Sequence, residues 1–156
     1  MSTMRTILEE MAPEAREALL AHSHQVTLAA GTRIFNEHQQ AERFWIVQCG
    51  TVHLDTHVPG HKNVVVNALG YRELLGWSWM FPPFSWHLGA TASREVRALE
   101  FDAAAVRELC KEDSDVGRSV AIAVAAVIAD RLDSARTRLL DLFAPYGSGR
   151  PLAYTR

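Results

Sequence analysis

The chain has 156 residues, of which 48% are hydrophobic and 22% charged, a composition that excludes a disordered or disulfide-stapled protein and allows one domain with a buried core. Its formal net charge is −2 and its 16 lysines and arginines are scattered, so charge does not indicate a nucleic-acid surface. Two cysteines and an N-terminus without an apolar leader predict a cytoplasmic protein, and the longest mostly apolar run, 116–129, is too short to cross a membrane.

The N-terminal part, residues 1–25, predicts two short helices. Ile7, Leu8 and Met11 supply the apolar positions of the first. Pro13 suits the first turn of the second helix, in which apolar residues continue at helical spacing up to Leu20.

Residues 26–102 predict an antiparallel β-roll. Short runs rich in β-branched and aromatic residues alternate there with glycine and proline, which is typical of many short strands. The clearest strand pair is 44–48 with 52–56, joined at Cys49-Gly50, and a hairpin through Pro59-Gly60 leads into the next strand. We therefore expect an antiparallel meander.

Residues 103–143 predict a short helix followed by a long one. The short helix covers 103–111, and either Asp113 or Ser114 can cap a final helix that runs to about Phe143. The remaining residues, 144–156, are rich in glycine and proline and are expected to form a flexible tail.

Two apolar stripes run along the long helix. Val120, Val124 and Val127 form one of them. The other has the alternating four- and three-residue spacing of a coiled-coil seam and consists of Ala121, Ala125, Ile128, Leu132, Ala135, Leu139 and Leu142. We expect one stripe to face the roll and the seam to form a parallel homodimer; the alternative is a helix buried wholly in its own domain.

The first strands carry a family resemblance. The stretch AAGTRIFNEHQQAERFWIVQCGTVHL, residues 29–54, is similar to the opening pattern of the sensor domain of catabolite-activator-type proteins. In that pattern a glycine, here Gly31, precedes an Ile-Phe pair, here Ile34-Phe35, and an aromatic-Ile-Val strand runs into a glycine turn, here Gly50.

Two later stretches extend the resemblance over residues 26–143. VNALGYRELLGW, residues 66–77, resembles the segment that leads to the family's phosphate-binding cassette, and IADRLDSARTRLLDLF, residues 128–143, resembles its dimer helix. The resemblance implies a mainly β domain with flanking helices: an eight-stranded antiparallel β-roll (a double-stranded β-helix or jelly roll) and a long C-terminal dimerisation helix.

The candidate ligand site departs from the family's pattern. A cyclic phosphate needs backbone N–H groups, a guanidinium for its charge and a carboxylate for the ribose hydroxyl. Where the family has Gly-Glu this chain has Gly76-Trp77, followed by Ser78, and where the family has its phosphate-binding arginine this chain has Trp86, with His87 beside it. We therefore expect a degenerate cassette, no cofactor, and weak or absent binding of cyclic nucleotides.

Aromatic residues crowd this cassette. Residues 77–87 contain three tryptophans, two phenylalanines and two prolines. The aromatic side chains either fill the emptied site or contact a protein partner; alternatively, they line a pocket for a different small ligand.

The functional hypothesis is a stand-alone regulatory or interaction domain that is not an enzyme. The chain ends 13 residues after Phe143, so we expect no DNA-binding module and an output through a protein partner. One alternative is a working cyclic-nucleotide receptor with unusual contacts, among them His87. The other is a cupin-like metal enzyme, because histidines such as His53, His57 and His61 are scattered over the roll, although they form no recognised metal or catalytic motif.

Overall fold

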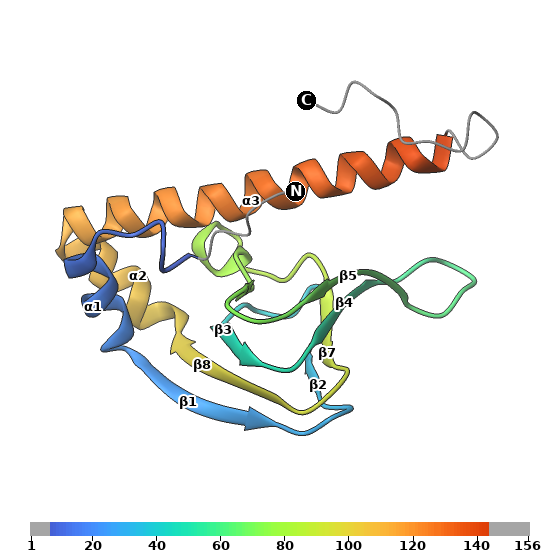
Figure 1. The fold of residues 1–156 in the computed structure, drawn as a ribbon, viewed down its shortest axis with the longest axis horizontal. Helices are drawn as coiled ribbons and strands as arrows, with labels where there is room; N and C mark the ends of the chain where they lie inside the picture. Colours follow the sequence, from blue (N-terminus) through green and yellow to red (C-terminus); the bar gives the residue numbers. More distant parts are fainter. Residues whose placement is uncertain (1–6, 144–156) are drawn as a thin grey trace.

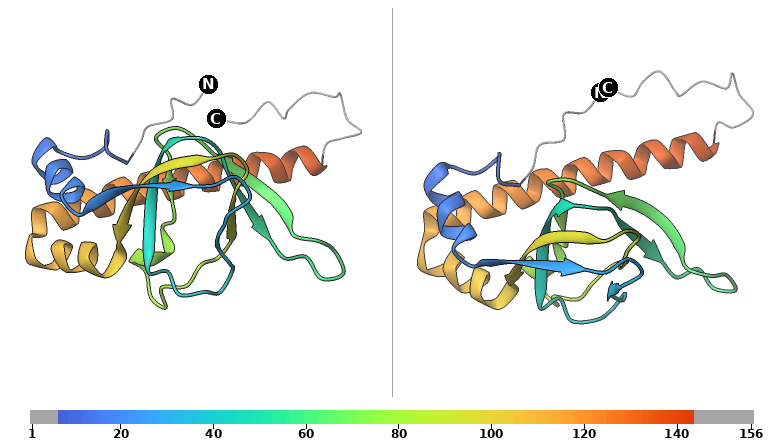
Figure 2. Two further views of the ribbon diagram at one scale, coloured as in Figure 1. Left: turned by 90° about the horizontal axis from the view of Figure 1, so that it is seen from below. Right: turned by 60° about the horizontal axis from the view of Figure 1, so that its bottom comes forward.

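The computed structural model describes residues 7–143, which form two four-stranded antiparallel sheets and three α-helices (Figure 1). The strand order is β1-β8-β3-β6 in the first sheet and β2-β7-β4-β5 in the second. Helices α1 and α2 lie at one end of the roll, and α3 extends along its side (Figures 1 and 2). The expected β-roll with flanking helices is confirmed.

The eight strands and the helices within residues 7–143 have the following bounds. The strands are β1 (Ser23–Leu28), β2 (Arg33–Phe35), β3 (Arg43–Cys49), β4 (Val52–Thr56), β5 (Val64–Leu69), β6 (Leu74–Leu75), β7 (Gly89–Ala92) and β8 (Val96–Asp102). The helices are α1 (Pro13–Leu20), the 3-10 turn η1 (Ser78–Met80), α2 (Ala103–Glu112) and α3 (Ser114–Phe143).

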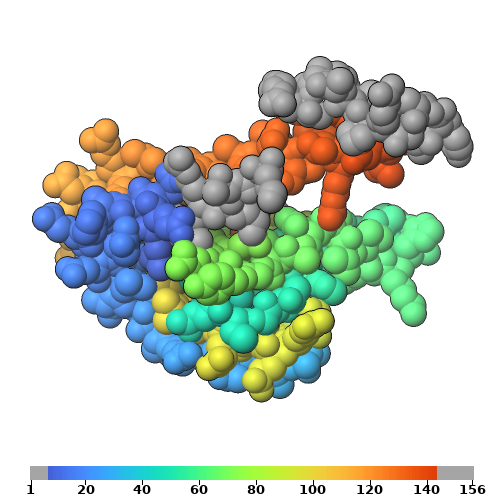
Figure 3. All heavy atoms as spheres, viewed as in Figure 1, coloured from blue at the N-terminus to red at the C-terminus, as the bar shows by residue number. Residues whose placement is uncertain are grey.

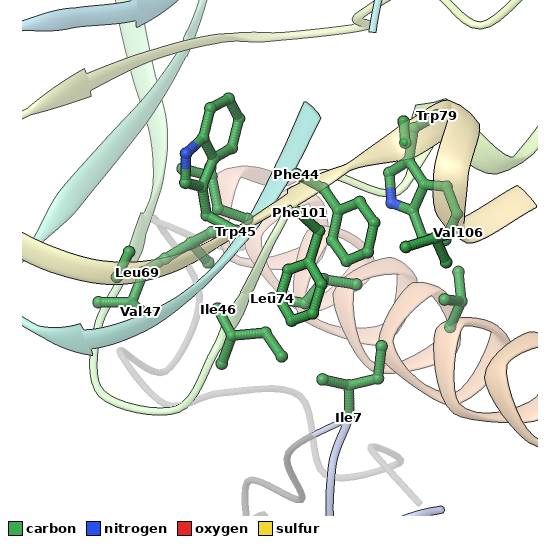
Figure 4. Close-up of a cluster of buried hydrophobic side chains, with 14 of the residues drawn as sticks. Ile7, Phe44, Trp45, Ile46, Val47, Leu69, Leu74, Trp79, Phe101 and Val106 are labelled. Carbon is green, nitrogen blue, oxygen red and sulfur yellow. The ribbon is translucent and has the colours of Figure 1, made fainter. Parts of the chain in front are cut away.

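Strand β3 of the first sheet is buried on both faces, and its successive side chains point to opposite sides of the sheet. Trp45 points into the roll, where it stacks on Phe35 of the second sheet at 5.9 Å. Phe44 points the other way and stacks on Phe101, with Val106 of α2 nearby (Figure 4). The chain thus has an inner core between the sheets and an outer core beneath the helices.

The N-terminal segment differs from the prediction. Its described part, from Ile7 to Glu10, is a turn rather than a first helix. Arg16 of α1 holds that turn by donating hydrogen bonds to the carbonyl oxygens of Leu8 and Met11, at 3.0 and 3.2 Å. Because side-chain bonds take these carbonyls, a short apolar run closes against the core without completing a helix.

The predicted pairing of β3 with β4 is wrong, although both strands exist. β3 pairs with β6 and β8, whereas β4 pairs with β5 and β7, so the chain crosses from one sheet to the other at Gly50. Gly50 has φ +98°, and a side chain there would clash with the carbonyl oxygen of Glu95. The turn therefore requires glycine for a crossover, not for a hairpin. The β4–β5 hairpin is as predicted.

The two C-terminal helices agree with the prediction. Asp102 caps α2 through the N–H of Ala105 at 3.0 Å, and Asp113 caps α3 through the N–H groups of Asp115 and Val116 at 3.1 and 3.2 Å. No helix within residues 7–143 combines the length and the apolarity of a membrane span. The predicted tail, 144–156, lies outside the described residues.

Candidate functional site

Trp86 lies inside the roll, at the position where the resemblance expects an arginine. It is only 4% exposed, and its ring stacks on Phe35 with centroids 4.0 Å apart and planes 14° apart. Trp45 lies 6.4 Å away on the facing sheet. Trp86 is also fixed by its backbone, which donates to the Gln39 carbonyl and accepts from the His38 N–H. The side chain therefore occupies the space between the sheets as core.

Gly76 makes room for this ring. It follows β6 with φ +99°, and a Cβ placed on it would lie 2.5 Å from Cη2 of Trp86. Its carbonyl oxygen accepts a 3.0 Å hydrogen bond from Nε1 of Trp79. The glycine of the cassette thus serves close packing of an indole in this chain.

Trp77, Ser78 and His87 form a cluster beside the filled interior, in which burial ranges from the buried Ser78 to the exposed His87. The Trp77 ring stacks on His87 at 5.1 Å, and the Ser78 hydroxyl lies 2.9 Å from Nδ1 of the same imidazole. Ser78 is only 3% exposed. Its hydroxyl is therefore closed to a substrate, and the serine–histidine contact holds the two ends of the cassette together.

The third tryptophan, Trp79, belongs to the outer core. It is fully buried and stacks on Phe44 at 4.0 Å. Arg107 of α2 donates a 2.7 Å hydrogen bond to the Trp79 carbonyl and lies over the Phe84 ring at 4.2 Å. The cassette is thus anchored to both cores, and Phe81 remains 45% exposed at its tip.

Two arginines of α3 attach this helix to the second half of the roll. Arg131 donates to the Leu74 carbonyl and Arg138 to the Val66 carbonyl. Burial lowers the pKa of Arg131, whereas the nearby carboxylates of Glu73 and Asp130 act in the opposite direction. Sequence reasoning missed Arg131, although it continues the core-facing stripe, four positions after Val127.

Burial also affects Glu73, which lies in the turn before β6. Removal of the carboxyl from water raises its pKa, and the hydrogen bond from the Gly70 N–H opposes that shift. Arg131 also lowers this pKa and Asp130 raises it. The charges of Glu73, before β6, and of Arg131, on α3, therefore influence each other's pKa.

Arg33 of β2 is another arginine of the roll, and its partner is the Asp55 carboxylate. Its guanidinium binds the buried Asp55 carboxylate in bidentate form, at 2.5 and 3.0 Å, and donates to Thr91 at 2.9 Å. The hydrogen bond that Arg33 donates to the Asp55 carboxylate raises the pKa of Arg33 above its usual value. A nucleotide phosphate could recruit Arg33 only by breaking this pair.

The scattered histidines and cysteines do not converge. Within residues 7–143 no group of three His, Cys, Asp or Glu side chains is arranged to hold a metal ion. His24 pairs with Glu100 at 3.2 Å, and Cys49 and Cys110 are free thiols. The described residues give the cupin-like alternative no metal centre.

The predicted dimer seam is mostly open on the single chain. Six of its seven residues are exposed, among them Leu132 at 62% and Leu139 at 54%. Ile128 is the exception, because it is partly buried against the core of its own chain. Val120 and Val124, on the neighbouring stripe, are fully buried, so this stripe faces the chain's own core.

A two-sheet roll with a cassette after β6 and a long helix across its side defines the fold of catabolite-activator-type sensor domains. The family model described as "Cyclic nucleotide-binding domain" matches residues 25–113, more than half of the chain. The chain therefore belongs to the cyclic nucleotide-binding domain family.

Individual relatives agree with this assignment. A CRP-like cAMP-activated global transcriptional regulator of Mycobacterium tuberculosis is 25% identical over 144 residues, or 92% of this chain, and the chain spans 62% of that regulator's length. A cyclic nucleotide-binding domain from Methylobacillus flagellatus shares the fold with a TM-score of 0.78 at 14% identity, covering 94% of this chain and 83% of that one. The Thermus thermophilus catabolite activator protein matches with a TM-score of 0.71 at 23% sequence identity, and the match covers 88% of this chain and 62% of that one.

Proposed function

We propose that this protein is a non-enzymatic regulatory or interaction domain whose roll is filled by its own Trp86 instead of a cyclic nucleotide. The observation that carries the proposal is the burial of Trp86 between the sheets, stacked on Phe35, at the position of the family's phosphate-binding arginine. Trp77 stands where the ribose-binding glutamate would be.

The chemistry of the cassette supports this proposal. An anionic phosphate taken from water needs charge-assisted partners, and an unpaired buried charge costs several kcal/mol, on the order of a thousandfold in affinity. An indole carries no charge, and its N–H can only donate, so neither Trp86 nor Trp77 replaces the missing group. Arg33 is engaged with Asp55. The site therefore lacks both polar anchors of a cyclic nucleotide.

A cyclic-nucleotide receptor with unusual contacts is the second candidate. The M. tuberculosis relative is named as cAMP-activated, which favours it. In this chain, however, the nucleotide could enter the roll only if Trp86 left its stack on Phe35. His87 would then be the nearest replacement for the lost arginine in the sequence.

Calorimetry distinguishes the two candidates. We expect no binding of cyclic AMP or cyclic GMP to the wild-type protein near neutral pH at ligand concentrations up to about 1 mM, because both charged contacts are lost. Thermal unfolding of the same sample verifies that the protein is folded. Micromolar or tighter binding of either nucleotide would refute the filled-roll proposal and favour the receptor.

The proposal includes the assembly and the partners. The exposed face of α3 forms a parallel homodimer, and the output passes to a protein partner that contacts the exposed tip of the cassette around Phe81 and Pro82-Pro83. The free thiols of Cys49 and Cys110 suit the reducing cytoplasm.

A further inference from the structure

We propose that a second cavity, outside the roll, binds a small carboxylate with a flat apolar body. This N-terminal pocket has a volume of about 320 Å³ and lies between the N-terminal turn, the end of β3 and the turn before β6. Figure 3 shows the N-terminal segment in blue beside the green part of the chain that contains this turn. The pocket does not depend on whether the roll accepts a nucleotide.

The floor of the pocket is apolar. Ile46 of β3 and Leu99 of β8 are register partners, so their side chains lie side by side on the outer face of the first sheet. Leu8 covers them from the N-terminal turn. Trp86 lies on the opposite, inner side of this sheet, since it stacks with Phe35 inside the roll. The floor therefore offers a flat ring an apolar contact separate from the cassette.

Arg16 supplies a positive charge at the wall of the pocket. Its half-buried guanidinium donates to the carbonyls of Leu8 and Met11. Within residues 7–143 no carboxylate lies within ion-pair distance of it. A guanidinium that has only neutral oxygen partners still attracts an anion, because charge-assisted hydrogen bonds are about twice as strong as neutral ones.

Arg72 supplies a second charge at the rim. Its φ of +68° is unusual for a residue with a side chain, and its N–H is held by the Val47 carbonyl at 2.7 Å. Its guanidinium meets Glu9 at 2.7 Å, in an ion pair whose two side chains are 54% and 47% exposed. Exposed pairs contribute little stability, so a ligand carboxylate can share Arg72 with Glu9 at small cost.

The charge balance and the size select the ligand class. Among residues 7–143, two guanidiniums and one carboxylate line the pocket, which favours one negative charge over the two of a phosphate monoester. The volume is at the lower end of the range of about 300–1,000 Å³ for small-molecule sites, so the pocket suits a body of one or two fused rings.

The test uses 2-naphthoate as the probe and follows backbone amides by NMR. We expect saturable shifts at Ile46, Val47 and Arg72, and binding of the neutral isostere 2-naphthamide at least tenfold weaker. Inorganic phosphate should produce no saturable shift at these amides.

Two variants test which arginine binds the carboxylate of the probe. Arg72→Gln removes an exposed ion pair with Glu9 and an exposed contact with the Tyr71 ring, so we expect the fold to be retained, and it should weaken 2-naphthoate binding about tenfold. Arg16→Gln should weaken it at least as much, with thermal unfolding as the check on folding, and the exposed Arg97→Gln of β8 is the matched control. Equal binding of acid and amide, unchanged affinity in Arg72→Gln, or no saturable shift up to about 5 mM would each overturn the proposal.

Discussion

Trp86 and Gly76 act as a pair, and a double-mutant cycle can measure their coupling. Trp86→Ala should destabilise the domain by about 3–5 kcal/mol, because it empties a fully packed site. Gly76→Ala should be costly in the wild type for two reasons, the left-handed backbone and the contact with Trp86. In the Trp86→Ala background only the backbone cost remains. Urea unfolding of the four proteins should therefore give a clearly non-additive sum.

The half-exposed Trp77 provides the control for that cycle. Trp77→Ala removes the same side chain from a surface stack and should cost less than Trp86→Ala. Indole added to the Trp86→Ala protein should raise its melting temperature without affecting Trp77→Ala, since only the former leaves a cavity shaped for an indole. Additive Gly76 and Trp86 effects would show that the ring does not press on the glycine.

Glu73 makes stability depend on pH in a direction fixed by its raised pKa. The folded protein holds the Glu73 proton more tightly than the unfolded chain, so its contribution is most favourable at acidic pH and is lost as pH rises through the folded pKa. Glu73→Gln keeps an acceptor for the Gly70 N–H but does not titrate. Relative to wild type, the variant should therefore gain stability as pH rises from about 4 to 7 in denaturant unfolding. A relative loss over that range would contradict burial as the main cause.

At the residue level the sequence predicted where the site departs from its family and offered aromatic side chains as its filling, but it did not indicate which ring lies inside the roll. Trp77 and Trp86 were identifiable from their spacing in the cassette. Phe35, which stacks on Trp86, is 51 positions away, and no local pattern connects two residues at such a separation. The exposure of Trp77 and the burial of Trp86 likewise depend on the facing sheet.

At the level of elements, the prediction concerns dimerisation through the long helix α3. If the proposed dimer forms through this seam, Leu132→Asp with Leu139→Asp should give monomers in light scattering, because the two charges would lie unpaired in an apolar seam. Both residues are exposed on the single chain, so the fold does not depend on them. Ile128 is unsuitable for this test because it packs against its own core.

The control for the dimer test is Val65→Asp on the edge strand β5, which changes a 51% exposed apolar residue away from the seam. It should leave the dimer intact. A dimer that persists in the Leu132 and Leu139 variant would show that the interface lies on another surface.

The elements were more predictable than their pairing, since the β4–β5 hairpin was expected and the partners of β3 were not. The sequence placed α2 and α3 almost to the residue, and for α3 the candidate caps Asp113 and Ser114 marked its start, because a capping signal acts within one turn of helix. The pairing of β3 failed because two strands separated by a glycine look alike whether they form a hairpin or cross between sheets. Only the approach of the Glu95 carbonyl to Gly50 decides between them.

At the level of the whole molecule, we expect no sequence-specific binding of DNA. Its formal net charge is −2 and its 16 lysines and arginines are scattered along the sequence, which does not indicate a basic surface for phosphates. In a gel-shift selection with randomised duplexes, we expect no enriched sequence and no complex that survives about 0.2 M salt. A salt-resistant complex with one enriched sequence would contradict this prediction.

The buried Trp86 also changes how the domain responds to its surroundings. A dissociable ligand stabilises its protein in proportion to the logarithm of its concentration, so the melting temperature of an ordinary sensor follows the metabolite pool. A ring attached to the backbone has a local concentration set by the chain itself and independent of the cell. The proposed filling by Trp86 therefore implies a roll that is equally occupied in starved and in well-fed cells, with a surface whose availability to a partner does not depend on a metabolite.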